Sequence, residues 1–132
     1  MSEDIRAVGA IRIDPPLTWP EIVGAPLNIH RNYDQDAVLR VVEDQVDTPD
    51  GPLLRRTVDA IIPERQMSNH HHLTEHIQEL VTRYCQGRTL TGFIDCVWAG
   101  GEDHWRIVVR GGVAVMVRPE WPVGARDEDG AS

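Results

Sequence analysis

Lysine is absent from this chain of 132 residues, and all 13 of its fixed positive charges are arginines. This absence excludes Schiff-base chemistry and a P-loop lysine, because both need an amine side chain. Long apolar runs are also missing: no segment approaches the roughly 18 residues of a membrane span, and the N-terminus lacks the layout of a signal peptide. We therefore expect a cytoplasmic protein that does not bind membranes.

Positive charge is in short supply overall, since the formal net charge is −8. Phosphate backbones repel an acidic domain, so nucleic acid is not an expected partner. The acidic side chains are also interleaved with arginines, whereas a DNA mimic would need a denser acidic face. The charge pattern therefore favours neither nucleic-acid binding nor mimicry.

Cysteine is scarce as well, with only Cys85 and Cys96. Two cysteines suit a reducing cytosol, and both are most simply small core residues. Cys96 and His104 lie on neighbouring predicted strands, which would allow a thiol and its base, but nothing nearby marks an oxyanion hole. There is no glycine-rich loop before a helix and no serine elbow. We therefore assign no catalytic residues and predict a non-enzymatic protein.

One long segment has a clear helical period. The spacing predicts a helix over residues 70–86, with Gly87 just after its end. Its apolar face is formed by Leu73, Ile77, Leu80, Val81 and Tyr84. A second, short helix is predicted at residues 18–21, where Thr18-Trp-Pro-Glu21 has the spacing of a capping box and Trp19 and Ile22 form the buried side.

The remaining segments read as strands by their alternation and turn residues. The predicted strands are residues 5–14, 37–47, 52–62, 88–98, 104–109 and 113–118. Pro15-Pro16 is expected to end the first strand, because proline cannot donate to a ladder. The order β-α-ββ-α-βββ predicts a single α+β domain over residues 1–122, a mostly antiparallel sheet with both helices on one face. Residues 123–132 are expected to be an acidic, flexible tail.

The second and third predicted strands form a hairpin around the turn Thr48-Pro-Asp-Gly51. Glu43 and Asp44 are expected to pair across it with Arg55 and Arg56. These ion pairs most simply form a solvated surface. Glu43 and Asp44 are also candidate partner-binding residues.

The histidine-rich start of the long helix is a candidate metal site. His72 and His76 are one turn apart, and Glu79 lies on the same flank. The letters His72-Leu-Thr-Glu-His76 also fit the inverted zinc-protease motif, although enzymes with that motif are far larger and add a third ligand downstream. The alternative is a helix start with solvated histidines. We expect no native cofactor, with adventitious or weak zinc or nickel binding at this cluster.

Trp98 and Trp105 flank a Gly-Gly turn between two predicted strands. They either close a hydrophobic end of the sheet or form an exposed aromatic anchor for a partner, since tryptophan is enriched at such anchors. An open sheet edge would offer a further contact, by strand addition or as a homodimer.

Four stretches together carry a family resemblance. They are GAIRIDPPLTWPEI (9–22), RVVEDQVDTPDGPLLRRTVDAIIP (40–63), EHIQELV (75–81) and TGFIDCVWAGGEDHWRIVVRGGVAVMVRP (91–119). They resemble a functionally uncharacterised family of short proteins from actinobacteria and their phages. The resemblance implies a source but no activity, and a phage origin favours small proteins that modulate a host protein.

Taken together, these features predict an acidic protein-interaction domain whose partner is a host or defence protein, from a phage or prophage. The alternative is a small metal- or ligand-binding protein that uses the flank of His72 and His76. The metal-binding alternative predicts near-stoichiometric zinc in the tag-free protein and its loss in His72→Ala.

Overall fold

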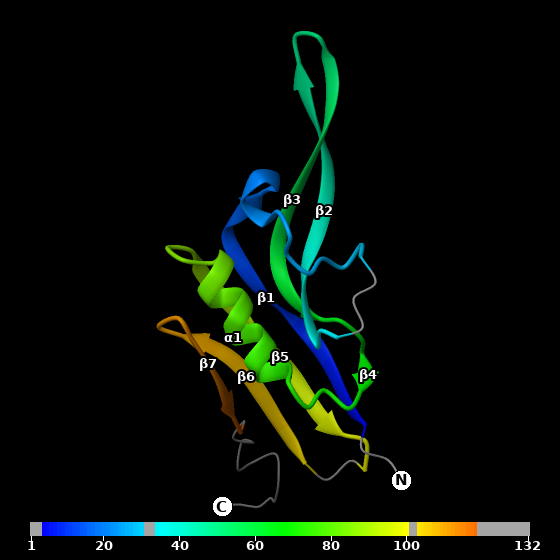
Figure 1. The fold of residues 1–132 in the computed structure, drawn as a ribbon, viewed down its shortest axis with the longest axis vertical. Coiled ribbons are helices and arrows are strands. Elements are labelled where there is room, and N and C mark those ends of the chain that lie inside the picture. Colours follow the sequence, from blue (N-terminus) through cyan, green and yellow to red (C-terminus); the bar gives the residue numbers. More distant parts are fainter. Residues whose placement is uncertain (1–3, 31–33, 101–102, 119–132) are drawn as a thin grey trace, which may run out of the picture.

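The computed structural model describes residues 4–30, 34–100 and 103–118. Its core is one antiparallel sheet with the strand order β2-β3-β1-β5-β6-β7, and a short strand β4 that pairs with the start of β1 (Figure 1). The strands are β1 Ile5–Thr18, β2 Ala37–Thr48, β3 Gly51–Pro63, β4 Met67–Ser68, β5 Thr89–Trp98, β6 His104–Arg110 and β7 Val113–Val117. The predicted hairpin and the predicted meander of the last three strands are both confirmed.

Strand β1 is the centre of the sheet, and it does not end at Pro15-Pro16 as the sequence predicted. The strand continues to Thr18, and the two prolines lie where its register with β3 shifts. Arg12 pairs with Ala60 and Leu17 with Val58, so the intervening residues of β1 bulge away from the ladder. A bulge needs no ladder hydrogen bond from the prolines, which is why the strand tolerates them.

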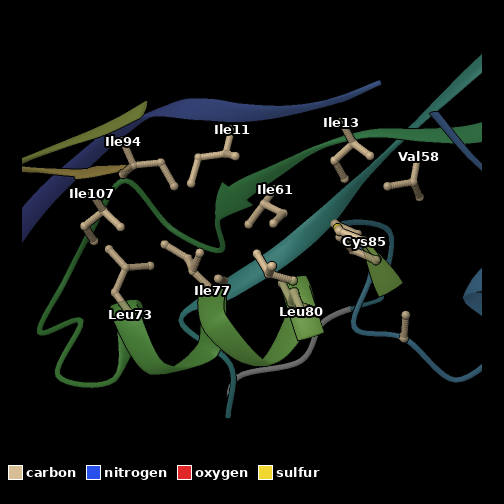
Figure 2. Packing of buried hydrophobic residues seen from close by; sticks show 14 of the residues in the cluster. Ile11, Ile13, Val58, Ile61, Leu73, Ile77, Leu80, Cys85, Ile94 and Ile107 are labelled. Atoms are coloured by element: carbon tan, nitrogen blue, oxygen red, sulfur yellow. The ribbon is translucent and has the colours of Figure 1, made fainter. Parts of the chain in front are cut away.

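Helix α1, Leu73–Tyr84, crosses one face of the sheet and closes the core. Figure 2 shows its apolar side chains pointing into a layer of sheet residues that includes Ile11, Ile61 and Ile94. The predicted face of the helix is confirmed, since Leu73, Ile77, Leu80 and Val81 are buried. The helix is shorter than predicted at both ends. It starts after the histidines, and Gly87 lies in the following turn with a positive φ of 78°.

The second helical element is a single 3-10 turn, η1, Trp19–Ile22. With one α-helix and one such turn on a large sheet, the fold is mostly β, so the predicted α+β class with two packed helices is wrong. The mostly antiparallel sheet is confirmed, but the predicted element order lacks β4 and has a helix where the structure has η1. Gly24 and Pro26 leave no room for a longer helix here. Ile22 still joins the same core as α1.

The β2–β3 hairpin extends beyond the other strands and forms the top of the molecule in Figure 1. Its base carries core residues such as Leu39 and Ile61, whereas residues 43–45 and 52–56 are exposed. We call residues 42–57 the hairpin arm. The predicted tail, residues 123–132, lies outside the described residues, as does the end of the predicted domain at residue 122.

Candidate functional site

Two cross-strand ion pairs hold the hairpin arm together. Glu43 lies opposite Arg56 and Asp44 opposite Arg55, with nitrogen–oxygen distances of 2.6 and 2.7 Å. The sequence predicted these pairs, and the structure confirms them. The bonds from Arg55 lower the pKa of the Asp44 carboxyl. The charges of Glu43 and Asp44 are thus compensated within the arm rather than presented unpaired.

The arm exposes two large apolar side chains. Leu53 is 60% exposed and Leu54 is 65% exposed. Consecutive strand residues point to opposite faces, so each face of the arm carries one leucine. A two-stranded hairpin is marginally stable alone, and burial of a leucine side chain contributes about 1.5–3 kcal/mol. The arm therefore leaves apolar surface uncovered that a contact with another molecule would bury.

A groove of about 570 Å³ lies beside the arm. Its lining residues come from the arm and from the end of β1: Thr18, Trp19, Pro20, Val46, Leu53, Leu54, Arg55, Arg56 and Thr57. The Arg56 guanidinium lies over the Trp19 ring, 5.5 Å from its centroid. Trp19 is 40% exposed, so the prediction that it would be buried is wrong. Its indole forms a wall of the groove instead.

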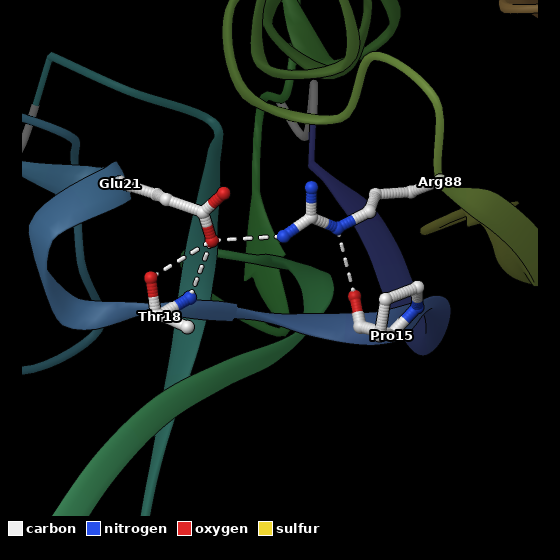
Figure 3. Close-up of polar contacts among 4 residues, drawn as sticks. All are labelled: Pro15, Thr18, Glu21 and Arg88. Carbon is white, nitrogen blue, oxygen red and sulfur yellow. Dashed lines mark hydrogen bonds and ion pairs between the residues drawn. The ribbon is translucent and has the colours of Figure 1, made fainter.

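Thr18 and Glu21, the two residues of the predicted capping box, bond each other on either side of Trp19 and Pro20 in the sequence (Figure 3). The Thr18 N–H donates to the Glu21 carboxylate at 2.8 Å, and the Thr18 hydroxyl donates to the same oxygen at 2.9 Å. The predicted capping box is therefore present, and the Thr18 hydroxyl also donates to the Glu21 carboxylate. Thr18 precedes a turn of only four residues, and Glu21 is the third residue of that turn.

Arg88, the residue before β5, connects this turn to the rest of the sheet (Figure 3). Its Nε donates to the Pro15 carbonyl at 3.0 Å and its Nη2 to Glu21 at 2.8 Å. Hydrogen bonds from the Thr18 backbone and hydroxyl, and then from Arg88, lower the pKa of Glu21. No local pattern predicts this contact, because Arg88 lies 67 residues after Glu21.

The rings of His72 and His76 lie near each other, with centroids 5.8 Å apart, but each of the predicted metal residues has another partner. His72 Nδ1 contacts Glu75 at 2.6 Å, and Glu79 pairs with Arg83. His76 Nδ1 accepts a hydrogen bond from the Asp36 N–H at 2.8 Å. The proton of the neutral ring then lies on Nε2, so His76 has no free lone pair for a metal. In the described parts of the chain, no group of three or more histidine, cysteine or acidic residues is placed to hold a metal ion.

The candidate partner residues lie on two separate surfaces. Glu43 and Asp44 are on the hairpin arm, whereas Trp98 ends β5 and Trp105 lies in β6, at the opposite end of the sheet (Figure 1). Both tryptophans are partly buried against the core. They line a second cavity together with His70, which the sequence analysis did not single out.

His70 is an unusual residue that the sequence pattern did not distinguish from its neighbours. It is 5% exposed, and neither of its ring nitrogens has a hydrogen-bond partner. Its φ of 45° lies in the left-handed region, which is uncommon for a residue other than glycine. Burial lowers the pKa of His70. The negative charges of Asp36, Glu64 and Asp4 and the nearby backbone of Arg65 oppose this shift. The Arg65 backbone does not reach hydrogen-bonding geometry with the ring.

The two thiols are buried and inert. Burial raises the pKa of Cys85 to about 11 and that of Cys96 to about 12. At neutral pH both are therefore protonated, and a thiol nucleophile at Cys96 has no support. His104, the other residue of that alternative, lies 3.6 Å from Asp95 instead.

The sheet has two edges, β2 and β7, and each is partly covered. The Leu39 N–H donates to the Pro26 carbonyl, and the Asn28 N–H donates to the Leu39 carbonyl, both at 2.9 Å. At the other edge, Gln78 of α1 accepts from the Ala114 N–H at 2.8 Å and donates to the Gly112 carbonyl. The arm half of β2 pairs with β3 on one side and, among the described residues, has no strand on its other side.

Comparison with known proteins places this chain in a family. A model of a family of unknown function, DUF6205, matches residues 1–131, so the chain belongs to that family. Searches of the curated proteins and of the solved structures each found no match. Among the described residues, none of the helical segments combines the length and the apolar character that crossing a bilayer requires.

Proposed function

We propose that this protein is a non-enzymatic protein-interaction domain whose main contact surface is the hairpin arm with Trp19. One observation carries the proposal: Leu53 and Leu54 are more than half exposed, beside an apolar groove next to Trp19. Tryptophan and arginine are enriched at interface hot spots, and Trp19 and Arg56 meet in this groove. The ion pairs of the arm keep its strands in register while the leucines face outward.

The chemistry of the surface defines the partner. The groove is apolar and its arginines are already paired, so its centre suits an apolar side chain. The whole chain carries a net charge of −8, and two of its acidic residues, Asp47 and Asp50, lie at the arm tip. Complementary charge speeds association, which favours a partner surface with an apolar centre and a basic rim. The family resemblance in the sequence adds a source to this proposal: a phage or prophage protein that binds a host or defence protein in the cytoplasm.

Competition with a surface variant tests this proposal. The double variant Leu53→Ser/Leu54→Ser replaces exposed side chains, so its thermal unfolding should remain close to that of the unaltered protein. Immobilised protein would capture a partner from an actinobacterial extract, and free protein would be added as competitor. We expect the unaltered protein to release the captured partner and the double variant to fail at the same concentration.

Two outcomes decide the matter. Equal competition by the double variant would overturn the role of the arm. The alternative partner is a second copy of this chain, and light scattering of the purified protein tests for it. A mass of twice 14.8 kDa that falls to the mass of one chain in the double variant would make the arm a homodimer contact. The charge-paired control Glu79→Gln lies on α1, away from the arm, and should compete as the unaltered protein does.

A further inference from the structure

A second cavity, of about 320 Å³, lies at the end of the sheet opposite the hairpin arm. The strand register explains its position. Cys96 lies opposite Trp105, and Ile107 opposite Met116, so these side chains share the face that α1 covers. The start of α1 and the preceding residues close the other side. The lining residues are Ile5, His70, His71, Leu73, Thr74, Glu75, Cys96, Trp98, Trp105, Ile107 and Met116.

The walls of this cavity have the composition of a small-molecule site. Most lining residues are apolar or aromatic, and the volume lies at the lower end of the range of ligand pockets, about 300–1,000 Å³. Trp98 and Trp105 both belong to it and pack only partly against the core. The cavity therefore suits a compact apolar body with few polar groups.

The charge of the lining residues determines which compact apolar ligands the cavity favours. Among the described residues of the lining, Glu75 is the one acidic residue and none is an arginine. The Glu75 carboxylate is solvent-exposed and contacts His72 Nδ1 at 2.6 Å, and a cationic ligand can compete with such an exposed contact. Indole faces attract cations through the ring quadrupole. A net charge of −8 adds to the preference for positive over negative ligands.

The buried ring of His70 is a second, independent observation that points to a ligand at this site. Both ring nitrogens are buried without a partner, although buried polar groups are almost always hydrogen-bonded. The neutral imidazole has one lone pair to offer, and an ammonium group is a donor without acceptor capacity. The nitrogens are closed to water in this conformation, so the ring must turn about its side-chain bonds to meet a ligand in the cavity.

We propose that this cavity binds a small organic ammonium ion with an apolar body, held between Trp98 and Trp105, with Glu75 as its counter-charge and His70 as its hydrogen-bond acceptor. The site is separate from the hairpin arm, so the proposal does not depend on the protein-interaction surface. It gives the histidine-rich segment a role through His70 and its cavity rather than through a metal.

Three probes of one shape and different charge test this proposal: 2-phenylethylammonium, 2-phenylethanol and phenylacetate. Indole N–H signals of the full chain, labelled with nitrogen-15, would be followed by NMR during titration at pH 7.5. The signals of Trp98 and Trp105 are assigned from Trp98→Phe and Trp105→Phe. We expect both signals to shift and saturate at millimolar ammonium, with binding about fivefold weaker for the alcohol and weaker still for the acid.

A matched pair of variants completes the test. Glu75→Gln should reduce ammonium affinity to that of the alcohol, while Glu79→Gln, four residues along the same helix, should leave it unchanged. The Trp19 signal reports the distant groove and should not move. Unshifted Trp98 and Trp105 signals, equal affinity for the three probes, or unchanged affinity in Glu75→Gln would each overturn the proposal.

Discussion

Arg88 contacts two segments that are far from it in sequence, the Pro15 carbonyl and the Glu21 carboxylate. Its side chain is 18% exposed, so water competes for these bonds only in part. Hydrogen bonds with a charged donor contribute more than neutral ones. A single arginine thereby holds the diproline bulge and the turn of Trp19 in place.

Replacement of this arginine should therefore destabilise the protein. We expect Arg88→Ala to lower the free energy of unfolding by about 1–2 kcal/mol, mainly through the lost bond to the Pro15 carbonyl. Chemical denaturation measures the change. Arg83→Ala is the control, because Arg83 makes an exposed pair on α1 and its loss should change stability by less than about 0.5 kcal/mol. Equal effects of the two variants would contradict the account of Arg88.

His70 makes stability depend on pH in a defined direction. Its pKa in the folded protein is below the ordinary value of 6.5, because burial disfavours the charged ring. The unfolded chain therefore binds more protons as pH falls through 6.5, and stability decreases. We expect His70→Leu to lose less stability than the unaltered protein between pH 7.5 and 5.5, as measured by urea unfolding.

The neighbouring residue provides the control for this pH effect. His71 is exposed, so His71→Leu should keep the pH dependence of the unaltered protein. Carboxyls with lowered pKa values, such as those of Glu21, Asp44 and Asp103, titrate below this window and do not obscure it. The same pH dependence in both variants would show that His70 is not the responsible group.

At the scale of single residues, the sequence predicted contacts between residues of one hairpin or one turn, but not contacts between distant segments. The pairs of Glu43 and Asp44 with Arg56 and Arg55 followed from strand register alone. The Glu21 half of the capping box followed from a spacing of three residues. His70 could not be found, because its burial depends on how the whole segment before α1 packs, and its neighbours His71 and His72 are exposed.

Helix α1 is the element on which the core depends. Ile77 is fully buried at the middle of its apolar face. We expect Ile77→Ala to lower the free energy of unfolding by about 2–5 kcal/mol, since it leaves a cavity between helix and sheet. Ile77→Asp should leave the chain unfolded by circular dichroism. Thr82→Ala, on the exposed side of the same helix, should be nearly neutral; tolerance of Ile77→Asp would mean that the helix is wrongly oriented.

Strand β7 depends on α1 in a second way. The Gln78 side chain bonds the Ala114 N–H and the Gly112 carbonyl at the sheet edge. We expect Gln78→Ala to accelerate hydrogen exchange of the Ala114 amide about five- to tenfold, as measured by NMR. Glu79→Ala should leave that rate unchanged. If the amide stays protected in Gln78→Ala, another group covers this edge.

At the scale of elements, periodicity predicted most strands and the face of α1, because those patterns arise from burial on one side. The length of β1 was missed, because a diproline reads as a stop while the bulge that accommodates it is set by β3 and β5. The second helix was predicted to be short, but it forms only the 3-10 turn η1, so the fold is mostly β rather than α+β.

At the scale of the whole molecule, the sheet separates two surfaces that the sequence could not relate. The exposed leucines and Trp19 lie at the arm, and the cavity of His70, Trp98 and Trp105 lies at the other end. The sequence pattern predicted Trp98 with Trp105, and Glu43 with Asp44, as alternative contact surfaces without relating their positions. Only the strand order, with β2 and β7 at opposite edges, shows that these residues belong to different surfaces.

The central claim is that the hairpin arm contacts a protein partner. A photo-crosslinking amino acid at Leu54, in cells that produce the protein, tests it most directly. The control is the same amino acid at Val113, an apolar residue outside the arm that is 52% exposed. We expect a discrete crosslinked product from position 54, lost when Leu53 and Trp19 are both changed to serine, and none from position 113. If position 54 gives no crosslinked product, or the same products as position 113, the hairpin arm is not the contact surface for a protein partner.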